Sequence, residues 1–172
     1  AAIRMPLQAT RRAPRSAALD TDLGWAAAAT IQVFVSRAAV AAAHALARPA
    51  LARATTRIAV GRATAAALTA LGLPALAAPS DAEDSSGVLG LDELQRVSGK
   101  RIAIWAAPGG RELIAQTLSA RGAEVRAIAV YRRLPVRPAA AAVRALRRSS
   151  AVVLSATSAA LLRELDRLLV QQ

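Results

Sequence analysis

The only tyrosine of the sequence, Tyr131, stands directly before two arginines, Arg132 and Arg133. A phenol can donate a proton or a hydrogen bond, and nearby cations favour its ionised form. Tyr131 follows an apolar run that is typical of a β-strand, so we expect it at a strand end. Two interpretations stay open from the residues alone: an acid–base group in a cleft, or an amphipathic residue packed at a domain junction.

Several hydroxyl side chains fall where predicted strands end or predicted helices begin. In open parallel sheets, ligands bind beyond the carboxyl ends of the strands. A helix N-cap explains any one of these residues singly. Their recurrence indicates one edge of the fold lined by hydroxyls and backbone amides. The residues are Ser36, Thr64, Ser155, Thr157 and Ser158.

Gly109 and Gly110 stand between a predicted strand and a predicted helix, where small residues let backbone N–H groups approach an anion. The segment lacks the Lys-Ser/Thr of a P-loop and the three-glycine spacing of a dinucleotide fingerprint. A plain strand-to-helix turn is therefore the simpler interpretation, and an anion cradle is the alternative.

Other chemistries have little support in the composition. The chain has no cysteine, and His44 is the only histidine, so thiolate catalysis, Cys-based metal sites and a Ser-His-Asp triad are not expected. Aromatic residues make up 2% of the chain, and Trp25 and Trp105 are expected to be packing residues. A metal site built from several histidines also has little support, because His44 is the only one.

The charge balance is strongly basic, with 23 Lys and Arg against 11 Asp and Glu in 172 residues, a net charge of +12. A GC-rich genome would produce such an Ala- and Arg-rich composition without functional meaning. Alternatively, arginine forks bind carboxylate or phosphate bidentately, which indicates a polyanionic partner. A nucleic-acid-binding module is the weaker alternative, because the basic residues are scattered and no recognition motif is present.

No apolar run approaches the length of about 20 residues that a membrane-spanning helix needs. The start of the sequence has neither an initiator Met nor a signal-peptide pattern. The simplest expectation is a cytoplasmic protein that is cut at its start and has no membrane partner.

Short apolar runs alternate with helical patterns, which predicts an α/β fold with a parallel sheet covered on both faces. A basic, proline-broken segment after Tyr131 indicates a domain boundary. The predicted strands are 31–35, 57–60, 73–77, 101–105, 124–130 and 151–154. The predicted helices are 36–49, where Pro49 is the stop, then 64–71, 88–97, 111–120, 138–147 and 158–169.

Five segments, in this order, resemble bacterial uroporphyrinogen-III synthases. They are residues 34–40, FVSRAAV; 59–65, AVGRATA; 85–89, SSGVL; 107–114, APGGRELI; and 130–133, VYRR. The resemblance implies two flavodoxin-like parallel-sheet domains joined by a two-stranded linker. Residues 9–129 would be the complete inserted domain, and residues 1–8 and 130–172 would be linker strands, near Met5–Gln8 and Val130–Arg133, plus a partial second domain.

The same resemblance implies a cofactor-independent lyase that cyclises hydroxymethylbilane, a linear tetrapyrrole, to uroporphyrinogen III with inversion of ring D. Tyr131 matches the tyrosine proposed to help the terminal hydroxyl leave. Ser36, Thr64 and Ser155 match hydroxyls that face the cleft. The substrate carries acetate and propionate groups, so carboxylate binding is expected at Arg37, Gly109, Gly110, Arg111, Thr157 and Ser158.

Two departures from the family pattern bear on activity. By this resemblance, the sequence would lack the first strand and helix of the family and the late segment with a further threonine-bearing turn. A monomer that binds no nucleic acid is expected. The alternative is a two-lobed domain that binds an anion or small molecule without catalysis.

Overall fold

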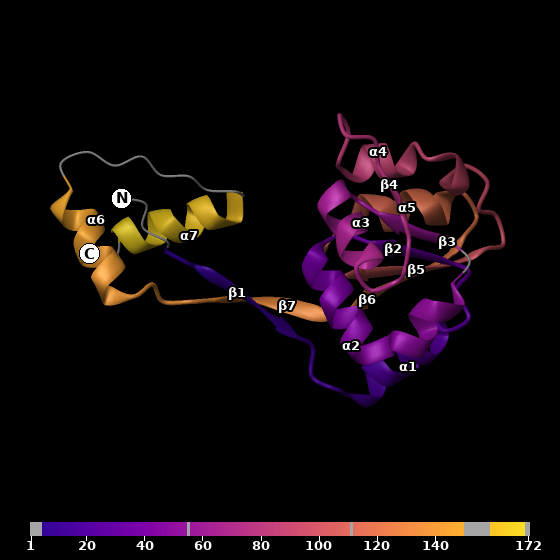
Figure 1. Cartoon of the computed structure of the whole chain (residues 1–172), viewed down its shortest axis with the longest axis horizontal. Helices are drawn as coiled ribbons and strands as arrows, with labels where there is room; N and C mark the ends of the chain where they lie inside the picture. Colours follow the sequence, from indigo (N-terminus) through magenta and orange to yellow (C-terminus); the bar gives the residue numbers. More distant parts are fainter. Residues whose placement is uncertain (1–4, 55, 111, 150–158, 171–172) are drawn as a thin grey trace. The chain divides into compact units, whose positions relative to one another are not determined.

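The computed structural model describes residues 5–54, 56–110, 112–149 and 159–170. The chain divides into two compact units, Arg12–Arg132 and a second formed by Ala1–Arg11 with Arg133–Gln172, both drawn in Figure 1. Among the described residues, no helix has the length and apolar character needed to cross a membrane.

A five-stranded parallel sheet forms the centre of the unit Arg12–Arg132. Its spatial order is β4-β3-β2-β5-β6, so the chain proceeds from β2 to one edge and then returns to build the other edge. The central pair is in register from Ile31↔Ile102 to Phe34↔Trp105. The strands are β2 (Ile31–Phe34), β3 (Thr56–Ala59), β4 (Leu76–Ala77), β5 (Arg101–Ala106) and β6 (Glu124–Ala129).

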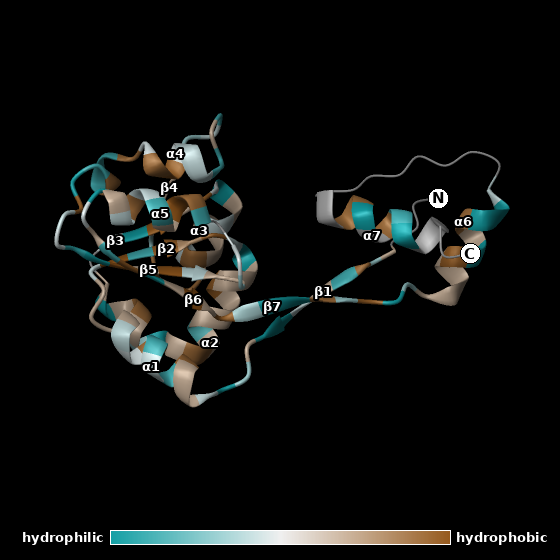
Figure 2. Ribbon diagram, turned by 180° about the vertical axis from the view of Figure 1, so that it is seen from behind, coloured by the Kyte–Doolittle hydropathy of each residue, from teal (hydrophilic) through white to brown (hydrophobic). Residues whose placement is uncertain are grey.

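Two apolar layers cover the two faces of this sheet, because alternate residues of each strand point to opposite sides. One layer packs Phe34 and Trp105 against helices α1 (Ala17–Ala26), α2 (Arg37–Arg53) and α3 (Arg62–Thr69). The other packs strand residues such as Ile104 against α4 (Ser85–Leu89), a 3₁₀ helix (Asp92–Leu94) and α5 (Glu112–Ala120). Figure 2 shows hydrophobic residues concentrated along the strands between these helices. The predicted α/β class with a parallel sheet is confirmed.

Helix α2 consists of two helical segments joined by a kink at Ala47, so the first segment ends just before Pro49, as predicted, and the second segment, which contains Pro49, was not predicted. A break at Ala47, with φ −140° and ψ 30°, absorbs the clash that proline imposes on the preceding turn. Distant side chains then satisfy the backbone carbonyls that the break and the helix end leave without helical partners. The donors are Arg15 to Leu46 O (3.2 Å), Gln32 to Ala50 O (3.0 Å), and Arg57 to Leu51 O (2.7 Å).

Three further element bounds differ from the sequence prediction. Helix α3 begins at Arg62 rather than Thr64, because Gly61 is its N-cap. The predicted helix 88–97 is instead α4 followed by the short 3₁₀ helix, and Asp84 accepts N–H bonds from Ser86 and Gly87 at the start of α4. The strand predicted at 73–77 is reduced to the two residues of β4.

A two-stranded ribbon pairs β1 (Gln8–Arg12) with β7 (Tyr131–Pro135). The linker strands therefore lie a few residues later than the predicted Met5–Gln8 and Val130–Arg133. Beyond the ribbon, the described part of the second unit contains α6 (Ala140–Arg148) and α7 (Ala159–Val170). The strand predicted at 151–154 lies outside the described residues.

Candidate functional site

Ser36 and Tyr131, far apart in sequence, meet by a hydrogen bond of 3.1 Å between Ser36 Oγ and the Tyr131 hydroxyl. Ser36 follows β2 and caps α2, where its Oγ accepts the Ala39 N–H at 3.1 Å. Tyr131 is the first residue of β7, and it is only 2% exposed within the core layer that contains α1 and α2. Core packing thus fixes the tyrosine ring, and its hydroxyl is held by the hydrogen bond with Ser36.

This pair lies at the carboxyl end of the sheet, at the point where the strand order reverses. Ladder hydrogen bonds continue one residue beyond the strands, from Val35 N to Trp105 O and from Val130 N to Ala106 O. The chain ends of β2, β5 and β6 are therefore neighbours. In open α/β sheets, the crevice beyond such a switch point is the usual ligand-binding position.

The turn between β5 and α5 belongs to the same edge. Gly109 has φ +66°, a left-handed conformation that disfavours other residues. Gly110 N donates to Ala107 O at 3.0 Å, and a Cβ on Gly110 would lie 3.0 Å from that same oxygen. Backbone conformation at Gly109 and close packing at Gly110 thus each favour glycine, without reference to a ligand. Arg111, which follows them, lies outside the described residues.

Thr64 lies beyond the carboxyl end of the neighbouring strand β3, in the first turn of α3, with 7% of its surface exposed. Its N–H donates to Gly61 O at 3.0 Å. At this helix start Arg62 Nε is 2.9 Å from Glu83 Oε1, and a Cβ on Gly61 would lie 2.5 Å from Glu83 Oε2. A carboxylate of the protein itself thus occupies the space next to Gly61.

Arg37 is exposed at the first position of α2, next to Ser36. The structure therefore brings Ser36, Arg37 and Tyr131 together at one edge and places Thr64, Gly109 and Gly110 at the ends of the adjoining strands. The other predicted site residues, Ser155, Thr157 and Ser158, lie outside the described residues.

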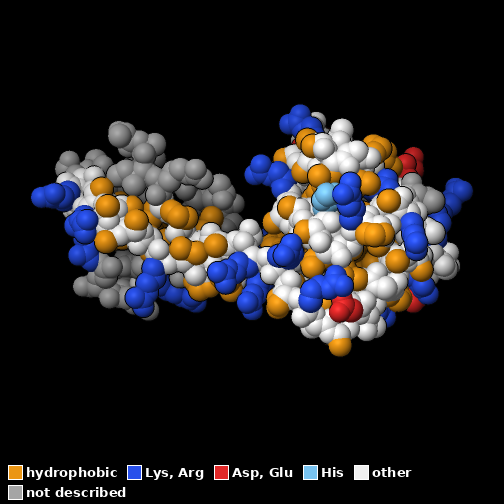
Figure 3. Space-filling view, turned by 60° about the horizontal axis from the view of Figure 1, so that its bottom comes forward, with side chains coloured by type: hydrophobic (Ala, Val, Ile, Leu, Met, Phe, Trp, Pro, Cys, Tyr) orange, Lys and Arg blue, Asp and Glu red, His pale blue; other side chains and the backbone are white. Residues whose placement is uncertain are grey.

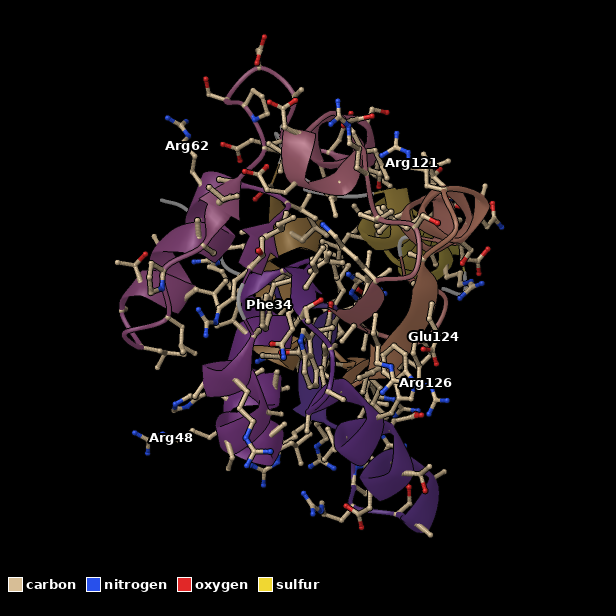
Figure 4. All side chains as sticks on the ribbon, turned by 90° about the vertical axis from the view of Figure 1, so that its right-hand side faces the viewer. Phe34, Arg48, Arg62, Arg121, Glu124 and Arg126 are labelled. Atoms are coloured by element: carbon tan, nitrogen blue, oxygen red, sulfur yellow. The ribbon has the colours of Figure 1, made fainter. Side chains whose placement is uncertain are left out.

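A second polar cluster, at the amino ends of β5 and β6, was not predicted. Trp25 of α1 lies against two guanidinium groups, with Arg101 Cζ 5.1 Å and Arg126 Cζ 4.8 Å from its ring centroid. Its indole N–H donates to Glu124 Oε1 at 3.0 Å. Arg101 Nε is 3.0 Å from Glu124 Oε2. Figure 4 shows Glu124 and Arg126 side by side.

Asp22 completes this amino-end cluster, with its Oδ1 3.2 Å from Arg126 Nη1. Hydrogen bonds from Trp25 and then from Arg101 lower the pKa of Glu124 below its ordinary value of 4.5. Every charge in the cluster has an opposite partner, so the arrangement fastens α1 to the sheet edge. The only sequence signal for this amino-end cluster is that Arg101 and Glu124 are the first residues of predicted strands.

Trp105 is a packing residue, as predicted. It is fully buried and stacks on Phe34 with ring centroids 6.1 Å apart. Its indole N–H donates to Gln32 Oε1 at 3.3 Å, and Gln32 is itself fully buried. The stacked Phe34–Trp105 pair belongs to the same core layer as the Tyr131 ring, on the same side of the sheet.

The surface of the unit Arg12–Arg132 carries basic side chains over much of its area. Figure 3 shows Lys and Arg scattered across the visible face rather than gathered into one stripe, with few acidic side chains between them. Some of these guanidiniums have acidic partners within the protein, as at Arg15, Arg62, Arg101 and Arg126.

Comparisons with known sequences agree on one family. A family model described as "Uroporphyrinogen-III synthase HemD" matches residues 1–172. The chain is 50% identical over 58 residues to the uroporphyrinogen-III synthase of Escherichia coli, covering 34% of this chain and 24% of that protein. It is 43% identical over 56 residues to the Proteus mirabilis enzyme, covering 33% and 28%.

Solved structures give the same answer. A mutant uroporphyrinogen III synthase from Thermus thermophilus matches with a TM-score of 0.60 and 27% identity, covering 76% of this chain and 52% of that one. The Helicobacter pylori enzyme, at 13% identity and a TM-score of 0.54, shares the fold. The chain matches about half the length of these structures and about a quarter of the curated relatives. With the family model matching along its whole length, the chain belongs to the uroporphyrinogen-III synthase family.

Proposed function

We propose that this chain acts in uroporphyrinogen-III synthesis, closing hydroxymethylbilane with inversion of ring D, and that Ser36 and Tyr131 form its reacting edge. The observation that carries the proposal is the 3.1 Å hydrogen bond between these two hydroxyls at the switch point of the sheet, in a chain of this family. Ligand binding at such a position is the general rule for open α/β sheets.

The first chemical step is loss of the terminal hydroxyl of the substrate. The C–O bond breaks, the oxygen takes a proton from the Tyr131 phenol, and water leaves. Electrons from the conjugated pyrrole replace those of the broken bond, and the pyrrole N–H proton passes to the Tyr131 phenolate, which gives a neutral azafulvene and restores the phenol. A general acid held at the leaving oxygen accelerates such a step.

Ser36 assists by fixing the phenol oxygen. Because Ser36 Oγ already accepts the Ala39 N–H, its own proton can be donated to the Tyr131 oxygen. In that arrangement the phenolic O–H is directed away from Ser36. The buried tyrosine ring restricts the motion of this oxygen, which is the kind of preorganisation that catalysis needs.

The azafulvene is then attacked by a substituted carbon of ring D, at the opposite end of the linear tetrapyrrole, giving a spiro intermediate that rearranges to the inverted macrocycle. The protein must hold the rings in this less favoured geometry, which calls for binding of the acetate and propionate groups. Arg37 and the N-terminus of α2 offer positive charge beside the reacting pair. Thr64, Gly109, Gly110 and Arg111, with Ser155, Thr157 and Ser158, are the further proposed contacts.

We also propose that the protein is a cytoplasmic monomer, that residues 9–129 form the inserted domain, and that catalysis needs neither metal nor organic cofactor. The hydroxyl, phenol and guanidinium groups of the site suffice for proton transfer and carboxylate binding. Gel filtration with light scattering tests whether the protein is a monomer, and an activity assay in the presence of a chelator tests whether a metal is needed.

The decisive experiment incubates the chain with enzymatically generated hydroxymethylbilane and separates the oxidised type I and type III products by chromatography. Hydroxymethylbilane alone closes to the type I isomer, so the expected result is type III product that scales with protein concentration. Only type I product would overturn the enzymatic proposal for this chain.

A further inference from the structure

The pairing of β1 with β7 places an arginine directly opposite Tyr131. Two hydrogen bonds, Ala13 N to Val130 O at 2.8 Å and Val136 N to Leu7 O at 2.9 Å, define an antiparallel ribbon with the same register at both ends. That register sets Arg12, the last residue of β1, across from Tyr131, the first residue of β7. Both residues belong to the unit Arg12–Arg132.

Residues opposite each other in an antiparallel pair extend from the same face of the ribbon. The Ala13–Val130 pair is hydrogen-bonded, so the adjacent Arg12–Tyr131 pair is of the non-hydrogen-bonded kind, whose side chains lie closest together. Tyr131 is buried, whereas Arg12 is exposed. The guanidinium of Arg12 therefore has solvent access beside the tyrosine whose hydroxyl contacts Ser36.

In the part of the chain that the structure describes, some arginines are neutralised by the protein itself, and Arg12 is not one of them. Among the described residues, Arg15, Arg62, Arg101 and Arg126 each form an ion pair with an Asp or Glu. Within the same described ranges, neither Arg12 nor Arg37 has an acidic partner. Two cations for which the described residues provide no acidic partner thus flank the Ser36–Tyr131 pair, one from β1 and one from α2.

We propose that Arg12 is a substrate-binding residue that takes a carboxylate of the terminal pyrrole ring in its guanidinium fork. Such a fork accepts a carboxylate by two parallel hydrogen bonds, which fixes orientation as well as position. The ring is the terminal one that bears the hydroxymethyl group, not ring D, so a carboxylate held by Arg12 keeps that hydroxymethyl group near the Tyr131 oxygen. This inference rests on the proposed function, because it takes the ligand to be a polycarboxylate tetrapyrrole.

The contrasting explanation is that Arg12 only keeps an exposed strand soluble, as charged side chains on edge strands often do. The two explanations differ in what a conservative substitution does. A solubilising arginine can be replaced by lysine without loss, whereas a bidentate carboxylate site cannot.

The test is equilibrium binding of uroporphyrin I, an octacarboxylate, to the full chain, followed by porphyrin fluorescence at low and at moderate salt. Arg12→Gln is expected to raise Kd about tenfold, which is the order of one charge-assisted contact. Arg12→Lys should give an intermediate value. Salt should weaken binding to the original chain more than binding to Arg12→Gln, because one screened contact is missing from the variant.

Arg48→Gln is the matched control, because it removes the same charge from an exposed position about three turns along α2 from Arg37. Figure 4 shows Arg48 pointing away from Phe34 into solvent. Its Kd should stay within about twofold, as expected for a distant screened charge. Equal weakening by Arg12→Gln and Arg48→Gln would show a general charge effect and overturn the proposal.

An activity arm separates this inference from the proposed function. If the chain forms type III product but Arg12→Gln keeps the original Kd and KM, the Arg12 proposal is wrong and the function stands. If the chain forms only type I product yet loses porphyrin affinity with Arg12→Gln alone, the carboxylate site stands and the enzymatic proposal falls. Absence of uroporphyrin binding by the original chain would also overturn the Arg12 site.

Discussion

The arginines at the two ends of the five-stranded sheet differ in their ion pairing. At the amino ends of β5 and β6, Arg101 and Arg126 lie against Trp25 and are neutralised by Glu124 and Asp22. At the carboxyl end, Arg37 stands beside Ser36 at the start of α2, where the described residues provide no carboxylate for it. The first cluster satisfies its own charges, and the second has positive charge to offer a ligand.

This difference indicates that the amino-end cluster contributes to stability and that the carboxyl edge contributes to function. A closed set of partners stabilises the element that carries it, whereas cations without counter-charges suit a site that receives an anion. The carboxyl edge is not uniform, however. Arg62 also lies at this edge, but its guanidinium forms an ion pair with Glu83. At Arg37, by contrast, the described residues place no such carboxylate.

The largest contrast is expected from Tyr131→Phe. Loss of the phenolic oxygen removes the proposed proton donor, so formation of type III product should fall about a hundredfold, within the range of general acid catalysis. The free energy of unfolding should fall by only about 1 kcal/mol, the net value of one hydrogen bond, because the ring stays in place. Initial rates and urea unfolding of the same preparations measure both. Equal turnover would reduce Tyr131 to a packing residue.

Trp25→Ala should show the opposite behaviour at the amino end. The substitution removes two cation–π contacts, the indole hydrogen bond to Glu124 and part of the α1 packing. These losses should lower the free energy of unfolding by about 2 to 3 kcal/mol. Uroporphyrin affinity should not change. Trp25→Phe, which keeps a ring but no N–H, should lose less, and a larger effect on affinity than on stability would erase the contrast between the two ends.

Local signals in the sequence were enough to predict the strands of the parallel sheet and most of its helices, but not α1. The runs 31–35 and 101–105 read as strands because they are apolar and β-branched, and Ser36 reads as a helix cap. Tyr131 was expected at a strand end, and the structure places it two residues after the last residue of β6, as the first residue of β7. Hydroxyls at the carboxyl ends of parallel strands share an edge in any such fold, which is why the sequence could associate Ser36 with Tyr131.

Features that depend on spatial order could not be read from the sequence. The short helical segment after the kink of α2 is one example, because its carbonyls are bonded by Gln32 of β2 and Arg57 of β3. The contact of Trp25 with Glu124 spans 99 residues and requires β6 to be the edge strand beside α1. The position of Arg12 opposite Tyr131 follows from ribbon register, which no local pattern specifies.

A smaller effect is expected at the turn of the carboxyl edge. Gly109→Ala should lower the free energy of unfolding by about 1 kcal/mol, because alanine is strained at φ +66° even though nothing lies within 4 Å of the added Cβ. Gly24→Ala is the matched control within α1, where the Cβ also meets nothing within 4 Å and helical propensity predicts a gain of about 0.5 to 1 kcal/mol. The same sign for both variants would contradict this account of Gly109.

The smallest effect is expected for Glu124→Gln, and it should depend on pH. The pKa of Glu124 is lowered in the folded protein by the hydrogen bonds from Trp25 and then Arg101. A carboxyl whose folded pKa is depressed stabilises the protein above its unfolded pKa, and this contribution is lost as the pH falls through the folded pKa. The original chain should therefore be slightly more stable than Glu124→Gln at neutral pH and low salt.

On acidification the two melting temperatures should converge, because a protonated Glu124 carries no more charge than glutamine. Thermal melts of both proteins across the acid range measure this convergence, and added salt should reduce the difference at neutral pH because Glu124 is exposed. A difference that persists unchanged below the folded pKa would mean that the shape of the Glu124 side chain, rather than its charge, matters. The amino-end cluster would then be held by packing around Trp25, and its closed set of charges would no longer distinguish it from the carboxyl edge.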